Sequence, residues 1–301
     1  MSDILAIIAK QVEESTGKSV DVLLKESQEA EIRGEKITLP PQQQAATQKA
    51  ELQASLPLWG DRIRGVPNSV LRSALFTATK RGKRAYLERV EIASVDKISV
   101  LFTGPRLDQA DLDVWEQCLH IARTSALGTR ISFTAHAFLK AIGRNTSGAN
   151  HEWLKGAFAR LAGSVVELKD GKRAYFGALI SHGERNDATG HFEIEINPKI
   201  ASLYNDDGWT GQDWEQRKSL QGKPLALWLH GFYSSHAQPF DYKIETLHKL
   251  CGSETTDLHK FKQSLKQALA DLSATTNWLA CTDKDKVQVF KTAETAVKRL
   301  S

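Results

Sequence analysis

Long apolar runs are absent from this 301-residue chain, and cysteine is scarce. No apolar run approaches the about 18 residues of a membrane-spanning helix, so we expect no membrane span. The start Met-Ser-Asp-Ile places an acid where a signal peptide carries positive charge, so we expect a cytoplasmic protein. Cys118, Cys251 and Cys281 form no C-x-x-C pair, and each lies among apolar residues. They are therefore expected to be buried free thiols in a reducing cytoplasm.

Signature motifs of enzymes are also missing. Gly17-Lys18-Ser19 resembles the end of a phosphate-binding loop, but Val12 stands where that loop needs its first glycine. His151-Glu152 starts a zinc-protease motif, but Lys155 replaces the second histidine. No G-x-S-x-G nucleophile elbow occurs. We therefore expect no enzymatic activity, no cofactor and no metal site. An enzyme such as a recombinase or relaxase ranks third among the functions considered, after the two functions named below, and it would cleave a DNA strand.

Composition permits a polyanionic partner and about two domain cores. The formal net charge is +4, with 41% hydrophobic residues. One or two amphipathic helices are expected within residues 3–29, and the polar segment 40–53 is typical of a linker. We predict an N-terminal extension and linker at 1–54 and two domains at 55–205 and 206–301.

One pattern of elements occurs twice, roughly at 112–196 and 224–290, which we call the first copy and the second copy. Each has an apolar helix, a short strand, a short second helix, a turn, a basic third helix and a hairpin. A helix-turn-helix followed by a two-stranded wing presents one helix to the DNA major groove. The predicted fold class is therefore α+β, with two tandem winged-helix domains after a flexible N-terminal extension.

Local signals place the elements of both copies. The turn Asp170-Gly171 predicts the hairpin that serves as the first wing. In the second copy Pro224 is suited to begin a helix, Gly252 to end one, and residues Ser253–Thr256 to form the turn and cap the third helix. The expected first-copy elements are helices at 111–123, 134–143 and 149–162, a strand at 131–133 and the hairpin at 165–180, preceded by strands at 86–93 and 97–103. The expected second-copy elements are helices at 224–232, 244–251 and 257–272, and strands at 240–242, 277–282 and 286–290.

Basic and polar side chains at the predicted DNA-facing positions form a candidate duplex interface. The start of a recognition helix meets base edges, and the cations around it meet phosphates. Asn and Arg can make bidentate base contacts, and Lys172-Arg173 at a hairpin tip would lie over a backbone or a minor groove. For each helix the alternative is an ordinary solvated charged face. The candidates are Lys80, Arg81, Lys83, Arg84, Arg144, Asn145, Ser147, Asn150, Lys155, Lys172, Arg173, Thr255, Thr256, His259, Lys260, Lys262 and Lys266.

A short peptide motif stands at the end of the linker. Its candidate anchors are Gln53, Leu56, Leu58 and Trp59, a glutamine followed by spaced leucines and an aromatic residue. Such a peptide suits pockets on a partner protein. The alternative is that Leu56, Leu58 and Trp59 pin the linker onto the domain, and the residues alone leave both possibilities open.

Six motifs, in matching order and spacing over about residues 53–290, resemble the TrfA family of plasmid replication initiators. They are Ser55-Leu56-Pro57-Leu58-Trp59, Pro67-Asn68, Leu71–Thr77, Phe232–His236, Lys243–Leu247 and Cys251-Gly252-Ser253. The resemblance implies two winged-helix domains that bind the directly repeated sites (iterons) of a plasmid origin and help to open an adjacent A+T-rich segment, with single-stranded DNA as a further ligand. The segment Gln53–Trp59 also resembles the peptide by which bacterial polymerases bind their sliding clamp.

The family resemblance further implies host DnaA, DnaB helicase and the polymerase sliding clamp as partners. It implies a homodimer in equilibrium with the monomer, in which monomers bind iterons and dimers are the inactive or regulatory form in copy control. We expect the second copy to supply more of the DNA affinity and the first copy also to take part in dimerisation. The alternative function is a winged-helix transcriptional regulator, which would not support plasmid maintenance.

Overall fold

The computed structural model describes Val22 and residues 55–79, 82, 84–95, 98–170, 173–204 and 208–292. The helices predicted within 3–29 and the linker at 40–53 lie outside the described residues, as do the candidates Gln53, Lys80, Arg81, Lys83 and Lys172. Residues 51–301 form one compact unit, whose helices and small sheets confirm the α+β class. Among its described helices, none is both long and apolar enough to cross a bilayer.

Capping residues set the helix starts of the first copy. Asp108 accepts hydrogen bonds from the backbone N–H groups of Ala110 and Asp111, and the Asp111 carboxylate accepts one from the Asp108 N–H. Thr134 caps the second helix as predicted, and Ser147 caps the third. The elements up to the end of this copy are β1 (Ile63–Pro67), α4 (Asn68–Leu71), β2 (Phe76–Thr77), β3 (Tyr86–Ile92), β4 (Ile98–Pro105), β5 (Leu107–Asp108), α5 (Gln109–Ala122), β6 (Arg130–Thr134), α6 (Ala135–Ala141), α7 (Gly148–Gly163), β7 (Val165–Asp170), β8 (Arg173–Gly177), β9 (Ile180–Asn186) and β10 (His191–Ile196).

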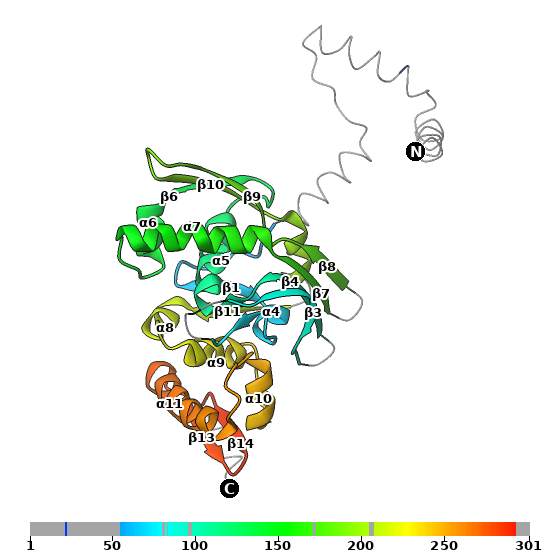
Figure 1. Ribbon diagram of the computed structural model, residues 1–301, viewed down its shortest axis with the longest axis vertical. Helices are drawn as coiled ribbons and strands as arrows, with labels where there is room; N and C mark the ends of the chain where they lie inside the picture. Colours follow the sequence, from blue (N-terminus) through cyan, green and yellow to red (C-terminus); the bar gives the residue numbers. More distant parts are fainter. Residues whose placement is uncertain are drawn as a thin grey trace. The chain divides into compact units, whose positions relative to one another are not determined.

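The wing of the first copy is not the hairpin that the Asp-Gly turn predicts. That hairpin exists as β7–β8, but β7 pairs with β4, giving a four-stranded sheet in the order β3-β4-β7-β8. The next hairpin, β9–β10, pairs with β6 in the order β6-β10-β9 and forms the wing, with α7 lying along it (Figure 1). The prediction was wrong because turn chemistry identifies a hairpin but not the strand beside which it lies.

Buried apolar pairs explain why β7 joins β4. Val166 and Leu168 of β7 stand opposite Phe102 and Val100 of β4, and all four side chains are buried. On a pleated strand these positions share one face, so β7 extends the apolar face of β4. The candidate Arg173 is consequently the first residue of β8 in the four-stranded sheet, not a residue of the wing.

The second copy follows its predicted order closely. Pro224 is the first residue of its first helix, and Gly252 follows its second helix with a φ of +62°. Asp257, and not the residues Ser253–Thr256, caps the third helix by accepting from the N–H groups of His259 and Lys260. The elements are η1 (a 3-10 helix, Pro198–Tyr204), β11 (Trp209–Asp213), α8 (Trp214–Ser219), α9 (Pro224–Ser234), β12 (Tyr242–Lys243), α10 (Ile244–Leu250), α11 (Leu258–Thr276), β13 (Leu279–Asp283) and β14 (Lys286–Phe290).

Two hydrophobic clusters fill the compact unit. The larger cluster includes Trp115, Leu139 and Leu161 of the first copy and extends along the chain to Trp214. The smaller cluster lies within the second copy, where α9 packs against α11, and takes in Val95 from the turn after β3 (Figure 1). Strand β11 pairs antiparallel with β1, which joins residues 209–213 to residues 63–67. The domain boundary at residues 205/206 stays a prediction.

Candidate nucleic-acid interface

The turn between α10 and α11 is held by contacts from both sides. The Nε2 of His248 lies 2.7 Å from the carbonyl oxygen of Thr255 and donates to it. From the β4–β5 connection, Arg106 donates to the carbonyl oxygen of Gly252 at 2.9 Å and forms a 3.1 Å ion pair with Glu254. Sequence reasoning missed Arg106, because nothing local shows that residues so far apart along the chain meet.

Helix α11 carries the candidate cations on its outer side. Its inner side buries Phe261, Leu265 and Leu269 against the second-copy core, as the apolar spacing predicts. On the opposite side of the helix, His259, Lys260 and Lys266 are exposed and Lys262 is half-exposed. The candidates Thr255 and Thr256 lie in the turn before the helix and are exposed as well. Over the described ranges, no ion pair involves Lys260, Lys262 or Lys266. This helix therefore presents three ammonium groups with no carboxylate partner among those residues.

The turn of the first copy has a different character. The guanidinium of Arg144 stacks on Trp153 of α7, with 3.6 Å from its central carbon to the ring centroid. The Asn150 amide donates to Asn145 Oδ1 at 2.6 Å, and Ser147 is occupied in capping α7. The candidates of this turn lie together, as predicted, but their polar groups are largely engaged with one another.

Three other cations, Arg84, Lys155 and Arg160, are paired with carboxylates. Arg84 binds Asp108 and Asp111 at 2.5 and 2.8 Å, and Arg160 of α7 binds the buried Asp111 at 2.6 Å. Lys155 of α7 lies 2.8 Å from Glu152 and 3.3 Å from Asp187. Hydrogen bonds to these two carboxylates raise the pKa of Lys155. Helices α7 and α11, the third helices of the two copies, therefore differ in how much unpaired positive charge they present.

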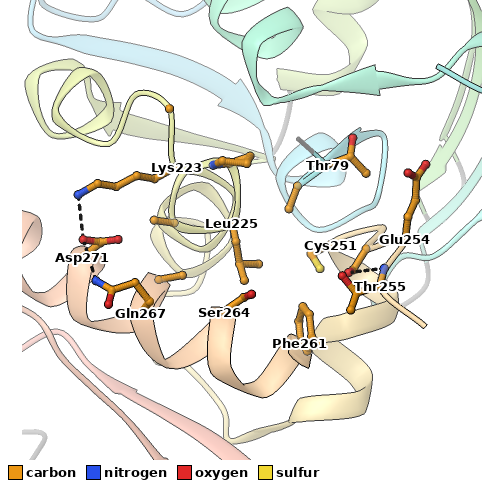
Figure 2. Close-up of a pocket in the computed structure, with 16 residues that line it drawn as sticks. Thr79, Lys223, Leu225, Cys251, Glu254, Thr255, Phe261, Ser264, Gln267 and Asp271 are labelled. Carbon is orange, nitrogen blue, oxygen red and sulfur yellow. Dashed lines mark hydrogen bonds and ion pairs between the residues drawn. The ribbon is translucent and has the colours of Figure 1, made fainter. Parts of the chain in front are cut away.

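A cleft of about 630 Å³ flanks α11. Figure 2 shows Phe261, Ser264 and Gln267 of α11 on one side of it and Leu225 of α9 on another. Lys223 Nζ donates to Asp271 at 2.8 Å along its border. The lining thus includes the paired lysine and two carboxylates, those of Asp271 and Glu254, a charge balance that does not favour a phosphate group.

The predicted partner-binding peptide is partly packed into the unit. Leu56 and Trp59 are only 4% and 8% exposed, whereas Leu58 is 78% exposed. The Trp59 indole donates to His120 Nδ1 at 3.2 Å and stacks on Tyr204 with ring centroids 6.1 Å apart. Two of the anchors therefore pack as a structural pin would, and binding of a clamp by this segment stays a prediction.

Comparison with known proteins shows which family the chain resembles. The model of the family described as TrfA protein matches residues 27–287. The plasmid replication initiator protein TrfA of Escherichia coli is 29% identical over 223 residues, which cover 71% of this chain and 58% of that protein. The chain thus spans less than two thirds of the length of this curated relative.

Two solved structures are similar to the chain at low sequence identity. Domains 2 and 3 of RctB match with a TM-score of 0.51 at 10% identity, covering 75% of this chain and 99% of that one. The Pi initiator protein, solved in complex with iteron DNA, matches with a TM-score of 0.46 at 14% identity, covering 65% of this chain and 97% of that one. The RctB match concerns the fold alone. Because the family model covers well over half of its residues, the chain belongs to the TrfA family.

Proposed function

We propose that this protein is a plasmid replication initiator that binds iterons at its origin through its two winged-helix copies. Membership of the TrfA family supports this function. The observation that carries the proposal is α11, a helix that follows a tight turn, has its start capped by Asp257 and carries Lys260, Lys262 and Lys266 in its N-terminal half. A recognition helix needs that arrangement, because its first turn meets base edges while the adjacent cations meet phosphates.

The proposed mechanism is binding combined with deformation. Helices α7 and α11 occupy successive major grooves of one repeat, and the wings lie over the backbone. The free energy of these contacts offsets the few kcal/mol needed to bend or unstack the neighbouring A+T-rich DNA. The free ammonium groups of α11 supply most of the electrostatic attraction, while the stacked and paired side chains of the first copy contribute mainly shape and hydrogen bonding.

The proposal also includes host proteins and a homodimer of the chain as partners. DnaA, DnaB helicase and the polymerase sliding clamp are recruited to the opened origin, and the monomer that binds iterons exchanges with a homodimer that restrains copy number. The family relationship motivates these partners. For the clamp, Leu58 is, among the three anchors that the structure describes, the one exposed enough to reach a pocket on the partner without rearrangement.

Two measurements test the function. The first is fluorescence anisotropy with labelled duplexes cut from the DNA that flanks the gene, at about 0.15 M salt. Binding to tandem repeats well above binding to a shuffled duplex is expected, and equal binding to both contradicts the proposal. The second asks whether the gene with that flanking segment maintains a plasmid that lacks any other origin, which separates an initiator from a transcriptional regulator.

A further inference from the structure

The turn of the first wing brings a carboxylate against the recognition helix of its own copy. Asp187 follows β9, and its Oδ1 lies 3.3 Å from the ammonium group of Lys155 on α7. The same carboxylate accepts from Arg185, with 2.9 Å between Arg185 Nε and Oδ1 and 3.3 Å between Nη2 and Oδ2. Asp187 thus contacts one cation of the wing and one of the helix.

The wing turn does not need this carboxylate for its shape. The side-chain oxygen of Asn186 accepts from the N–H groups of Ala188 and Thr189 at 3.0 and 3.2 Å. The N–H of Gly190 donates to the Asn186 carbonyl at 2.8 Å, and Gly190 has a φ of +68°, which favours glycine. Asn186 and Gly190 therefore define the turn, and the Asp187 carboxylate is left to its two cations.

These ion pairs lie at the surface, where they contribute little to folding. The side chains of Asp187 and Arg185 are 62% and 45% exposed. Exposed pairs of this kind stabilise a fold weakly and are screened by salt. Their larger effect concerns ligands, because a cation that is already paired attracts a phosphate less strongly than a free one.

We infer that Asp187 is a counter-ion that limits the DNA affinity of the first copy by holding Lys155 away from the phosphates. This inference rests on the proposed function and names a residue that tunes it. Lys155 also pairs with Glu152 of its own helix at 2.8 Å, so Asp187 is the second carboxylate that a duplex docking on α7 must displace, and the one that the wing supplies. In the described part of the chain, the second copy has no such counter-ion, because the lysines of α11 have no carboxylate partner there.

The test compares Asp187→Asn with a control variant that has the same net charge. Glu193→Gln removes one negative charge from the same hairpin, where Glu193 lies 3.5 Å from Arg130 and does not contact Lys155. The full chain is titrated into a labelled mixed-sequence duplex of about 20 base pairs, long enough for two successive major grooves, over a series of salt concentrations. Thermal melting by circular dichroism checks that each variant is folded.

Asp187→Asn is expected to lower Kd several-fold and to steepen the log–log salt dependence by about one to two. Glu193→Gln should change both much less. In a Lys155→Met background, the steepening caused by Asp187→Asn should be smaller by about one. Equal effects of Asp187→Asn and Glu193→Gln, or the same gain in both Lys155 backgrounds, overturn the inference. If the wild-type chain binds no duplex at all, the proposed function fails instead, so the two failures are distinguishable.

Discussion

Arg217 of α8 donates a 2.8 Å hydrogen bond from Nε to Asp113 Oδ1 of α5, and both side chains are buried. The same Nε lies 3.0 Å from a carboxylate oxygen of Glu116, and Nη2 reaches the carbonyl and side-chain oxygens of Gln109, both at 3.2 Å. Helix α5 opens the first copy and α8 leads into the second. This buried ion cluster therefore joins the first copy to the helix that precedes the second copy.

Replacing Glu116 with Gln should change how stability depends on pH. Burial raises the pKa of Glu116 to about 7 from an ordinary value of 4.5. The folded state then holds a proton that the unfolded state releases, so Glu116 lowers the free energy of unfolding as pH rises between these values, by up to about 3 kcal/mol. Urea unfolding of both proteins across this range should show wild type losing stability relative to Glu116→Gln as pH rises.

The difference between the two curves is the readout for Glu116. Burial lowers the pKa of His230 to about 3 from 6.5, which makes stability rise with pH over that range in both proteins. Parallel curves for wild type and Glu116→Gln would mean that Arg217 keeps the carboxylate ionised throughout.

Substitutions of Trp59 and Leu58 should have different effects, the first on folding stability and the second on partner binding. Trp59→Ala removes a buried indole and its hydrogen bond to His120, so we expect a loss of about 3–5 kcal/mol in unfolding free energy. Leu58→Ala should change stability by less than about 0.5 kcal/mol, because that side chain is 78% exposed. Leu58→Ala should nevertheless weaken capture by purified sliding clamp, with DNA binding unchanged. Unaltered capture would leave the segment with a structural role alone.

Lys260→Ala and Lys266→Ala should each weaken binding to all duplexes. Each exposed ammonium that neutralises a phosphate adds about one to the log–log salt slope, so each substitution should flatten the slope by about that amount. Lys199→Ala, an exposed lysine of η1, is the control with equal charge loss and should leave the slope unchanged. Anisotropy titrations at several salt concentrations measure this, and a slope that stays constant for Lys266→Ala shows no phosphate contact there.

Two glycine substitutions test the turn before α11. Gly252→Ala places a Cβ 2.6 Å from Thr77 Cγ2 at a φ of +62°, so we expect a loss of about 1–3 kcal/mol in unfolding free energy. Gly148→Ala, at the start of α7, adds a Cβ with no atom within 4 Å and should instead raise stability by up to about 1 kcal/mol. Urea unfolding compares the pair; equal effects would argue against a strained turn.

The elements whose signals lie within a few residues could be predicted from the sequence. Thr134 caps α6, Pro224 begins α9 and Gly252 follows α10, as their local chemistry indicates. The apolar stripe of α11 likewise predicts its buried side. These features depend on backbone geometry and helical period, which neighbouring residues control.

The candidate site could be predicted only in part. The sequence determined which residues are cationic and which helix follows each turn. Tertiary structure alone decided that Lys155 meets Asp187 while Lys266 has no carboxylate partner among the described residues, and that β9–β10 is the first wing. The physical reason is that ion pairing and strand pairing depend on distances between residues far apart along the chain, which charge pattern and turn chemistry do not encode.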